Sequence, residues 1–265
     1  MKSLPFWISL PFVCLWIAAP AAASAADPGA AGKAVFEKAR DSDVGYGDSR
    51  AVVKMELRSS SGEVSLRQME IEVLERPDHG ARSLIVFDNP PDVRGTKVLT
   101  HSEAQKEDEQ WIYLPAFSRA KQISGSNKTS AFMGSEFTYE DINSIYVMVE
   151  KYSYRLLRDE NLDGSSCSVV ERIPLYGGSG YSRQEVWVDD KDSYIRKVEY
   201  FDRSGADLKT LAIDTFSAYA GGHWRPARMT MTNHANGRIT VLTWDKYRFH
   251  NGLKASDFEL SALKR

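Results

Sequence analysis

The chain has 265 residues, a formal net charge of -2 at pH 7, and 42% hydrophobic and 26% charged residues, which is the composition of a globular protein. Charges of both signs alternate along the sequence without a basic patch, so nucleic acid is not an expected partner. The sequence contains only the cysteines Cys14 and Cys167, which excludes a fold held by several disulfides.

Residues 1–25, MKSLPFWISLPFVCLWIAAPAAASA, have the features of a secretory signal peptide. A lysine precedes an apolar core, and residues 23–25 form the small-residue A-x-A pattern before a cleavage site. We therefore expect cleavage between Ala25 and Ala26, with the bond before Asp27 as the neighbouring option, and export of a soluble mature chain to the periplasm. A retained membrane anchor is disfavoured because the apolar core is short for a span and contains two prolines.

Cleavage would leave Cys167 as the only cysteine, so the mature chain must bury a sufficient core without an intrachain disulfide. The sequence from residue 26 to residue 265 shows no Pro/Ser/Gly linker and no break in composition, which predicts a single domain.

The first predicted element of the mature chain is a short helix over residues 29–40, where good helix formers place Phe36 and Ala39 on one side. After it the hydrophobic period changes to two. Residues 52–58 and 69–74 alternate apolar with charged side chains, which predicts half-buried antiparallel strands.

The next strand, EQWIYLP, is apolar on both faces, with Trp111 and Tyr113 on one and Ile112 and Leu114 on the other. Both sides of the sheet must therefore be covered at this point. We expect the N-terminal helix and the irregular segment 130–142 to be the covers.

Segment 130–142, SAFMGSEFTYEDI, combines a local helix signal with unassigned apolar residues. Thr138 and Asp141 resemble a capping box, and Phe137 and Ile142 then hold the positions of a hydrophobic staple.

Phe132, Met133 and Tyr139 have no place in that pattern and lie near Gly134. One hypothesis is that they contact an apolar ligand from a mobile cover, since methionine and aromatic side chains adapt to variable apolar shapes. The alternative is that they are ordinary core.

The C-terminal half predicts a meander of strands separated by turn-forming sequences. These strands are 181–188, 194–201, 207–216, 223–232 and 238–249. Asn236-Gly237, before the last strand, predicts a type I′ turn.

The segment DENLDG, residues 159–164, resembles the start of a calcium loop, but Val170 stands where the bidentate Glu is required. We expect a hairpin turn at Asp163-Gly164 instead.

Residues that could carry catalysis are scattered. The histidines show no metal-ligand spacing, there is no G-x-S-x-G sequence, and Cys167 lacks a neighbouring basic residue in the sequence. We expect no enzyme activity, no metal and no cofactor.

Six segments together resemble the outer-membrane lipoprotein-sorting proteins of the LolA-like superfamily. They are NPPDVRGTKVL (89–99), WIYLP (111–115), FMGSEFTYEDI (132–142), YSRQEVWVD (181–189), YFDRSG (200–205) and DFEL (257–260). The resemblance implies a mainly β (α+β) domain over residues 26–265. It would be a single curved antiparallel sheet, forming an open half-barrel with short helices across its concave apolar cavity.

The resemblance also implies a monomeric periplasmic carrier that binds acyl chains of a lipoprotein or lipid and moves them toward the outer membrane. Cargo would come from an inner-membrane transporter and pass to an outer-membrane acceptor. Two alternatives remain: a sensor or accessory module of an inner-membrane lipid exporter, and a hydrolase of unrecognised type.

Candidate ligand contacts follow from strand alternation and from segment 130–142. They are Phe132, Met133, Tyr139, Trp111, Tyr113, Trp187 and Trp244. An error of one residue in register would turn each strand residue to the opposite face.

Overall fold

The computed structural model describes residues 27–77, 80–104, 107–144, 148–219 and 222–264. The expected signal peptide and its cleavage site therefore lie outside the described residues.

Strands make up most of the described chain. They are β1 (Asp48–Arg58), β2 (Val64–Glu75), β3 (Ala81–Asn89), β4 (Lys97–Ser102), β5 (Glu109–Leu114), β6 (Arg119–Ile123), β7 (Tyr152–Leu162), β8 (Ser165–Pro174), β9 (Tyr181–Asp189), β10 (Ile195–Asp202), β11 (Asp207–Ala218), β12 (Trp224–Asn233) and β13 (Ile239–Phe249).

The α-helices are α1 (Pro28–Asp43) and α2 (Tyr139–Ser144). Short 3₁₀ turns complete the described elements: η1 (Pro115–Phe117), η2 (Gly125–Thr129), η3 (Phe132–Gly134), η4 (Val149–Lys151), η5 (Ala255–Phe258) and η6 (Leu260–Lys264).

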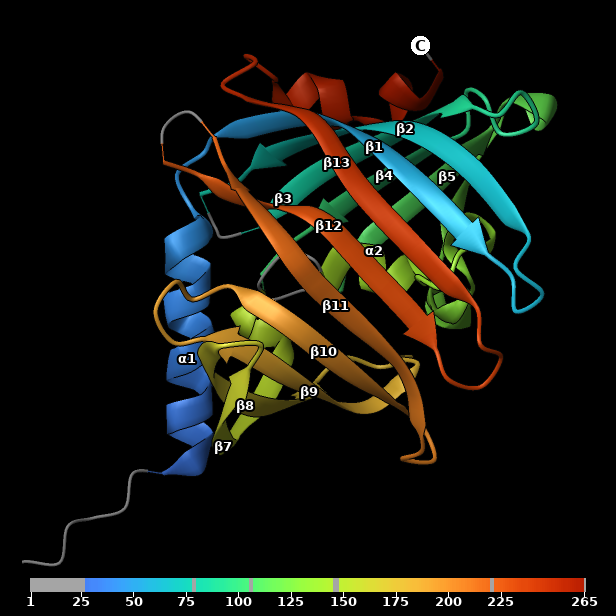
Figure 1. The fold of residues 1–265 in the computed structure, drawn as a ribbon. Coiled ribbons are helices and arrows are strands. Elements are labelled where there is room, and N and C mark those ends of the chain that lie inside the picture. The colour runs from blue at the N-terminus through green and yellow to red at the C-terminus, as the bar shows by residue number, and fades with distance from the viewer. Residues whose placement is uncertain (1–26, 78–79, 105–106, 145–147, 220–221, 265) are drawn as a thin grey trace, which may run out of the picture.

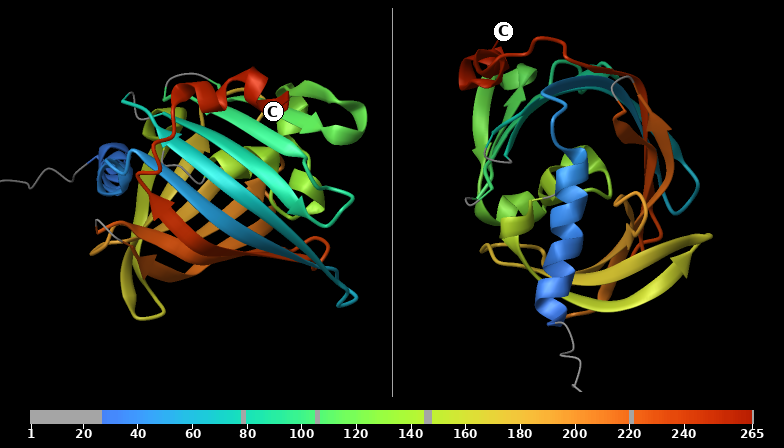
Figure 2. Two further views of the ribbon diagram at one scale, coloured as in Figure 1. Left: turned by 90° about the horizontal axis from the view of Figure 1, so that it is seen from above. Right: turned by 90° about the vertical axis from the view of Figure 1, so that its left-hand side faces the viewer.

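All the strands belong to one antiparallel sheet of 13 strands, in the order β6-β5-β4-β3-β2-β1-β13-β12-β11-β10-β9-β8-β7. The sheet curls around a central space, with α2 and its neighbouring turns inside the curve (Figures 1 and 2). Within the described chain β6 and β7 are the two edges and do not pair, so the barrel remains open. The predicted open half-barrel is thus confirmed, and each strand predicted from the sequence is present.

The two predicted turns have different outcomes. At Asp163-Gly164 both residues have positive φ, 50° and 87°, and the turn joins β7 to β8, so that hairpin prediction is confirmed. The prediction of a type I′ turn at Asn236-Gly237 is wrong. Such a turn needs positive φ at both residues, and here Gly237 has positive φ whereas Asn236 does not. The connection is longer: the amide of Gly237 donates to the carbonyl of Asn233 over 2.9 Å.

Helix α1 begins where Asp27 caps it, its carboxylate accepting a hydrogen bond of 3.0 Å from the amide of Gly29. The helix packs against β7 and β8 and runs across one end of the half-barrel (Figure 2). At Gly32 the contact is so close that a Cβ atom would lie 2.8 Å from the backbone nitrogen of Leu156. The predicted helix is confirmed, but it does not cover β5.

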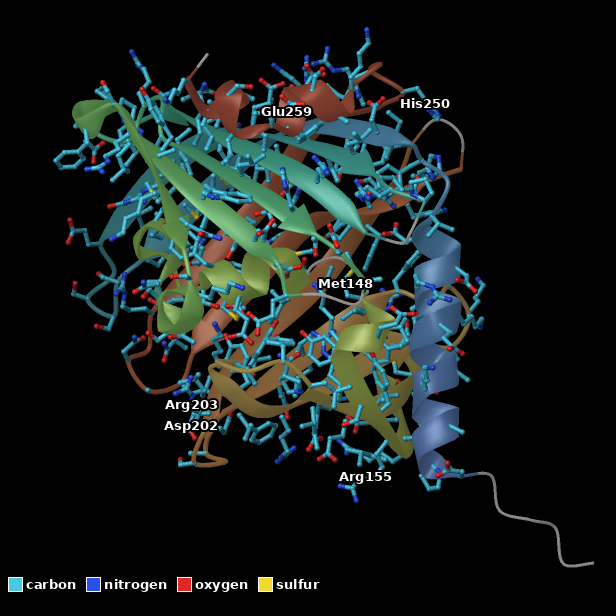
Figure 3. The ribbon with its side chains drawn as sticks, turned by 180° about the vertical axis from the view of Figure 1, so that it is seen from behind. Met148, Arg155, Asp202, Arg203, His250 and Glu259 are labelled. Atoms are coloured by element: carbon cyan, nitrogen blue, oxygen red, sulfur yellow. The ribbon has the colours of Figure 1, made fainter. Side chains whose placement is uncertain are left out.

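The outer face of β3 to β5 is covered instead by the C-terminal turns η5 and η6. Phe258 and Leu263 are buried there against Leu84 and Leu99. Glu259, at the junction of the two turns, marks this cover above the sheet (Figure 3). The DFEL sequence therefore closes a second, smaller core on the convex side.

The main core fills the concave side between the sheet and segment 130–142. It joins Phe36 of α1, Phe132 and Phe137 of the segment, and inward residues of the strands such as Phe87 and Val198. An additional layer across the concave face thus supplies the cover that an open sheet requires.

Candidate functional site

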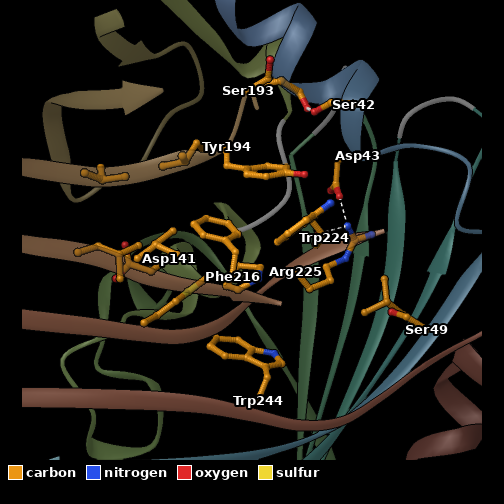
Figure 4. A pocket seen from close by; sticks show the side chains of 18 of the residues that line it. Ser42, Asp43, Ser49, Asp141, Ser193, Tyr194, Phe216, Trp224, Arg225 and Trp244 are labelled. Atoms are coloured by element: carbon orange, nitrogen blue, oxygen red, sulfur yellow. Dashed lines mark hydrogen bonds and ion pairs between the residues drawn. The ribbon is translucent and has the colours of Figure 1, made fainter. Parts of the chain in front are cut away.

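A cavity of about 140 Å³ opens between the C-terminal end of α1, α2 and the concave face of the sheet (Figure 4). Its walls are mainly aliphatic, with Ile195 and Val198 of β10, Leu211 and Ile213 of β11, and Met229 of β12. Leu211 and Ile213 alternate with outward-facing residues, and an irregularity in the pairing between Ile195 and Lys197 allows Ile195 and Val198 to face the same side.

Three aromatic side chains surround the more exposed part of the cavity. Tyr194 and Phe216 are stacked, with ring centroids 4.9 Å apart, and Trp224 lies 6.4 Å from Tyr194 with 45% of its surface exposed. We call these three residues the aromatic rim (Figure 4). Such rings offer a large apolar contact area at the entrance.

An ion pair between Asp43 and Arg225 crosses the same region (Figure 4). The Arg225 guanidinium also lies 4.8 Å from the ring of Tyr46 and 5.3 Å from that of Phe249. Burial raises the pKa of Asp43 to about 6, with Arg225 opposing the shift and Glu75 adding to it. The carboxyl group of Asp43 therefore takes up a proton at a higher pH than an ordinary aspartate does.

Arg172 of β8 is a deeply buried charged group of the cavity wall, with 2% of its surface exposed. Its guanidinium carbon lies 4.5 Å from the ring centroid of Tyr152 and 5.5 Å from that of Phe36. Its Nε donates a hydrogen bond of 2.6 Å to Oε1 of Gln184. Among the described residues, no carboxylate forms an ion pair with Arg172, and none accepts a hydrogen bond from its two terminal nitrogens.

Segment 130–142 is tied to the sheet by a second buried cation, Lys209 of β11. Its ammonium group lies 2.5 Å from Oδ2 of Asp141, and the two side chains are 3% and 1% exposed. Lys209 also donates to the carbonyl of Glu136 over 3.0 Å, and Tyr181 donates to Asp141 over 2.7 Å. The cover is thus fixed by a fully paired charge network.

The local helix signal of this segment is confirmed. The amide of Thr138 donates to Asp141 over 2.7 Å, and the amide of Asp141 donates back to the Thr138 hydroxyl over 3.1 Å, which is a capping box. Phe137 and Ile142 are both buried in the main core, as their staple positions predict.

The three remaining predicted residues of the segment do not line the cavity. Phe132 is 0% exposed and packs between Phe87 and Tyr139. The centroid of its ring lies 5.8 Å from that of Phe87 and 5.4 Å from that of Tyr139. Met133 and Tyr139 are half-buried against the same core. Because Phe132 packs on Phe87 of β3, the alternative of ordinary core describes its position in this structure, and contact of the segment with a ligand stays a prediction.

Trp111 and Tyr113 were expected to face inward and instead pack on the outer face beneath η5 and η6. Trp111 pairs with Leu99 of β4 across the sheet, and both belong to that convex core. Ile112, the neighbour between them, packs against the main core. The error is one residue in register on a strand that is apolar on both faces.

Trp187 shows the same error, because Val186 and Val188 occupy the inner face of β9. Trp187 packs on the outer face with Cys167 and lies 4.2 Å from the ammonium group of Lys197. Trp244 is the one predicted strand residue placed in the cavity wall.

The aromatic rim, the Asp43–Arg225 pair and Arg172 are not among the residues predicted from the sequence. A signal for Arg172 existed, since it follows the inward residue Val170 by two positions on β8. The adjacent Glu171 is also charged, so the pattern does not say which of the two faces inward.

Other chemistry has little support in the described part of the chain. Within it, no three His, Cys, Asp or Glu side chains are grouped so as to hold a metal ion. The Cys167 thiol is buried, and burial raises its pKa, which disfavours the reactive thiolate. None of the described helices has the length and apolar character needed to cross a bilayer.

Several solved structures are similar to this protein over most of its length. The first is an outer membrane lipoprotein-sorting protein domain from Vibrio parahaemolyticus, 41% identical, with a TM-score of 0.86, covering 89% of this chain and 100% of that one. The chain belongs to this lipoprotein-sorting family. A DUF1329 family protein from Desulfovibrio piger is 33% identical, with a TM-score of 0.84 and coverage of 89% and 99%.

The family shares its fold with the LolA superfamily. A LolA superfamily protein from Nitrosomonas europaea is 20% identical, with a TM-score of 0.70 over 87% of this chain and 98% of that one. A family model described as "-like: Uncharacterized protein" matches residues 79–265, from just before β3 through the end of the chain. No curated protein matches the chain.

Proposed function

We propose that this lipoprotein-sorting family member is a non-enzymatic periplasmic carrier that holds an acyl chain in the cavity of the half-barrel. The observation that carries the proposal is the aliphatic wall of β10, β11 and β12, which opens through the aromatic rim. The names of its relatives and the exported location expected for residues 26–265 support the same role.

The energetics fit a carrier that needs a partner for release. Burying each methylene group contributes about 0.8 kcal/mol, so a chain of a dozen methylenes gains on the order of 10 kcal/mol. Such a ligand leaves slowly unless an acceptor takes it. We therefore propose a donor at the inner membrane and an acceptor at the outer membrane, as the family resemblance implies.

The cavity must widen when it is loaded. Its volume of about 140 Å³ is similar to that of a cavity of ~150 Å³ that holds one benzene molecule. A long acyl chain needs several times this space. Because the Lys209–Asp141 network fixes segment 130–142, we propose that the walls separate at the aromatic rim and the C-terminal end of α1.

Native mass spectrometry of protein purified from its own host tests this function. We expect a mass excess equal to one lipid, which is lost on denaturation. A matched variant, Leu211→Trp, adds volume to the cavity wall and should purify without lipid while thermal melting still shows a folded chain. Wild-type protein with no lipid and a stably bound second protein would contradict the carrier and support the accessory module.

A further inference from the structure

We propose that Arg172 is a head-group site and that the cavity takes a single-chain amphiphile ending in a carboxylate or phosphate. This inference rests on the proposed carrier function and names the class of ligand. It assigns the anionic end of the ligand to the floor of the cavity and the tail to the apolar walls.

Arg172 carries a buried charge that has no carboxylate partner among the described residues. An arginine guanidinium stays protonated in proteins and has five N–H donors. Arg172 is 2% exposed, and one of those donors, on Nε, bonds to Gln184. A buried charge is costly unless an opposite charge and hydrogen bonds compensate it, and no described residue supplies the opposite charge.

The groups around Arg172 also orient its guanidinium. The rings of Phe36 and Tyr152 lie 5.5 Å and 4.5 Å from the guanidinium carbon, and Gln184 holds the Nε edge. These contacts hold the guanidinium beside the cavity, and none of the described residues forms a hydrogen bond with its two terminal nitrogens. That pair of parallel donors matches the two oxygens of a carboxylate or phosphate.

The buried carboxylates of Glu140 and Asp141 are bonded to groups other than Arg172. Glu140 accepts hydrogen bonds from the Tyr176 hydroxyl over 2.8 Å, the Ser179 hydroxyl over 2.5 Å and the Gly180 amide over 2.9 Å. It is therefore committed to holding the loop before β9. Lys209 shows the contrasting arrangement, in which the chain itself provides Asp141 to a structural cation.

The direction of the ligand follows from exposure. Arg172 and the neighbouring wall residue Tyr200 are 2% and 1% exposed, whereas Trp224 on the aromatic rim is 45% exposed. An anionic head at Arg172 therefore lies deep, and the tail extends along Val198 and Leu211 toward the rim. A neutral acyl group would leave Arg172 uncompensated.

Fluorescence titration with cis-parinaric acid and with its methyl ester tests the inference on lipid-stripped protein at pH 8. We expect the wild type to bind the acid about 10- to 100-fold more tightly than the ester, the range for hydrogen bonds to a charged group. Arg172→Met should abolish this preference while leaving ester affinity unchanged. Lysophosphatidic acid, added as competitor, should displace the probe from the wild type and thereby test phosphate against carboxylate.

Arg183→Met is the matched control, because Arg183 also stacks on a ring, that of Phe201 at 3.4 Å, but pairs with Glu185. It should keep the full preference for the acid. Equal binding of acid and ester by the wild type, or undiminished acid binding by Arg172→Met, would overturn the inference and leave the carrier function standing.

Failure of the wild type to bind either probe would instead overturn the proposed function itself. If Arg172→Met does not fold, the wild-type ratio of acid to ester affinity still decides the question. Arg172→Lys should then show an intermediate ratio, because lysine keeps the charge but lacks the planar fork.

Discussion

Two regions of the concave face each bury a cation, and the two cations differ in whether a carboxylate of the chain pairs with them. Around Lys209, the carboxylate of Asp141 and the carbonyl of Glu136 compensate the charge within hydrogen-bond distance. Around Arg172, two aromatic rings and Gln184 surround a guanidinium that has no carboxylate partner among the described residues. The first region fixes the cover of the half-barrel, and the second presents an unpaired charge to the cavity.

The paired cation stabilises the fold, whereas the unpaired cation is available for binding a ligand. A cation paired within the chain contributes when the chain folds, and removing it leaves a buried carboxylate alone. A cation left unpaired in a cavity lowers stability until a ligand compensates it, and the ligand then stabilises the fold by mass action. The following variants separate these two roles.

The largest expected effect is on the paired region. Lys209→Met should lower the free energy of unfolding by about 3–5 kcal/mol, because it strands Asp141 in the core. Urea denaturation of the wild type and the variant measures this difference in the free energy of unfolding. The control Lys197→Met removes a partly exposed cation on the outer face and should cost less than about 1 kcal/mol. A similar small loss in both variants would contradict the role given to the buried pair.

Phe132→Ala should cost nearly as much, about 3–4 kcal/mol, because it leaves a cavity between Phe87 and Tyr139. The mobile-cover hypothesis predicts only about 1–2 kcal/mol for such a change. Chemical denaturation without ligand distinguishes the two. The half-buried neighbour Met133, changed to alanine, should lose about 1 kcal/mol.

Arg172→Met should change the stability of the empty protein less, because methionine replaces an uncompensated charge with an apolar chain of similar length. The substitution should instead reduce the stabilisation that a bound ligand provides. A fatty acid at 100 times the wild-type Kd should stabilise the wild type by about 2.7 kcal/mol, and a variant that binds tenfold more weakly by about 1.4 kcal/mol. Thermal melts with and without ligand measure both. Equal stabilisation would remove Arg172 from the site.

The smallest expected effect concerns Asp43 at the aromatic rim. Its pKa is raised to about 6, so it contributes stability at low pH, and this contribution is lost as pH rises through about 6. The stability of the wild type relative to Asp43→Asn should therefore increase from pH 7.5 to pH 4.5. Melting curves of both proteins at the two pH values test the sign, and a difference that falls over this range would disprove the shift.

The sequence predicts the fold well because strands that are buried on one face only show a clear alternation of apolar and polar residues. In β1 and β2 apolar residues alternate with charged ones, and the capping box of Thr138 and Asp141 is a local pattern. Strand β3 is harder, since Leu84 packs on the convex core and Ile85 on the concave one. A strand buried on both faces shows no alternation.

The site is predicted less well, in part for the same physical reason. Trp111 lies on a strand that is apolar on both faces, so alternation cannot choose between it and Ile112. Trp187 shares one face of β9 with the charged Glu185, so the outward direction of Trp187 is present in the alternation, and the prediction from the sequence did not follow it.

Trp244 stands between the polar residues Thr243 and Asp245, and its inward direction is predicted correctly. The surroundings of Arg172 come from α1, β7 and β9, which are distant in the sequence. A local sequence pattern therefore cannot predict them.

A crystal structure of the protein with bound hexadecanoic acid would locate the carboxylate of the ligand relative to Arg172. We expect the carboxylate oxygens at about 2.7–2.9 Å from the terminal nitrogens of Arg172, with the chain passing Trp244 toward the aromatic rim. A fatty acid whose carboxylate lies at the rim beside Arg225, or whose chain lies outside the cavity, would contradict the account.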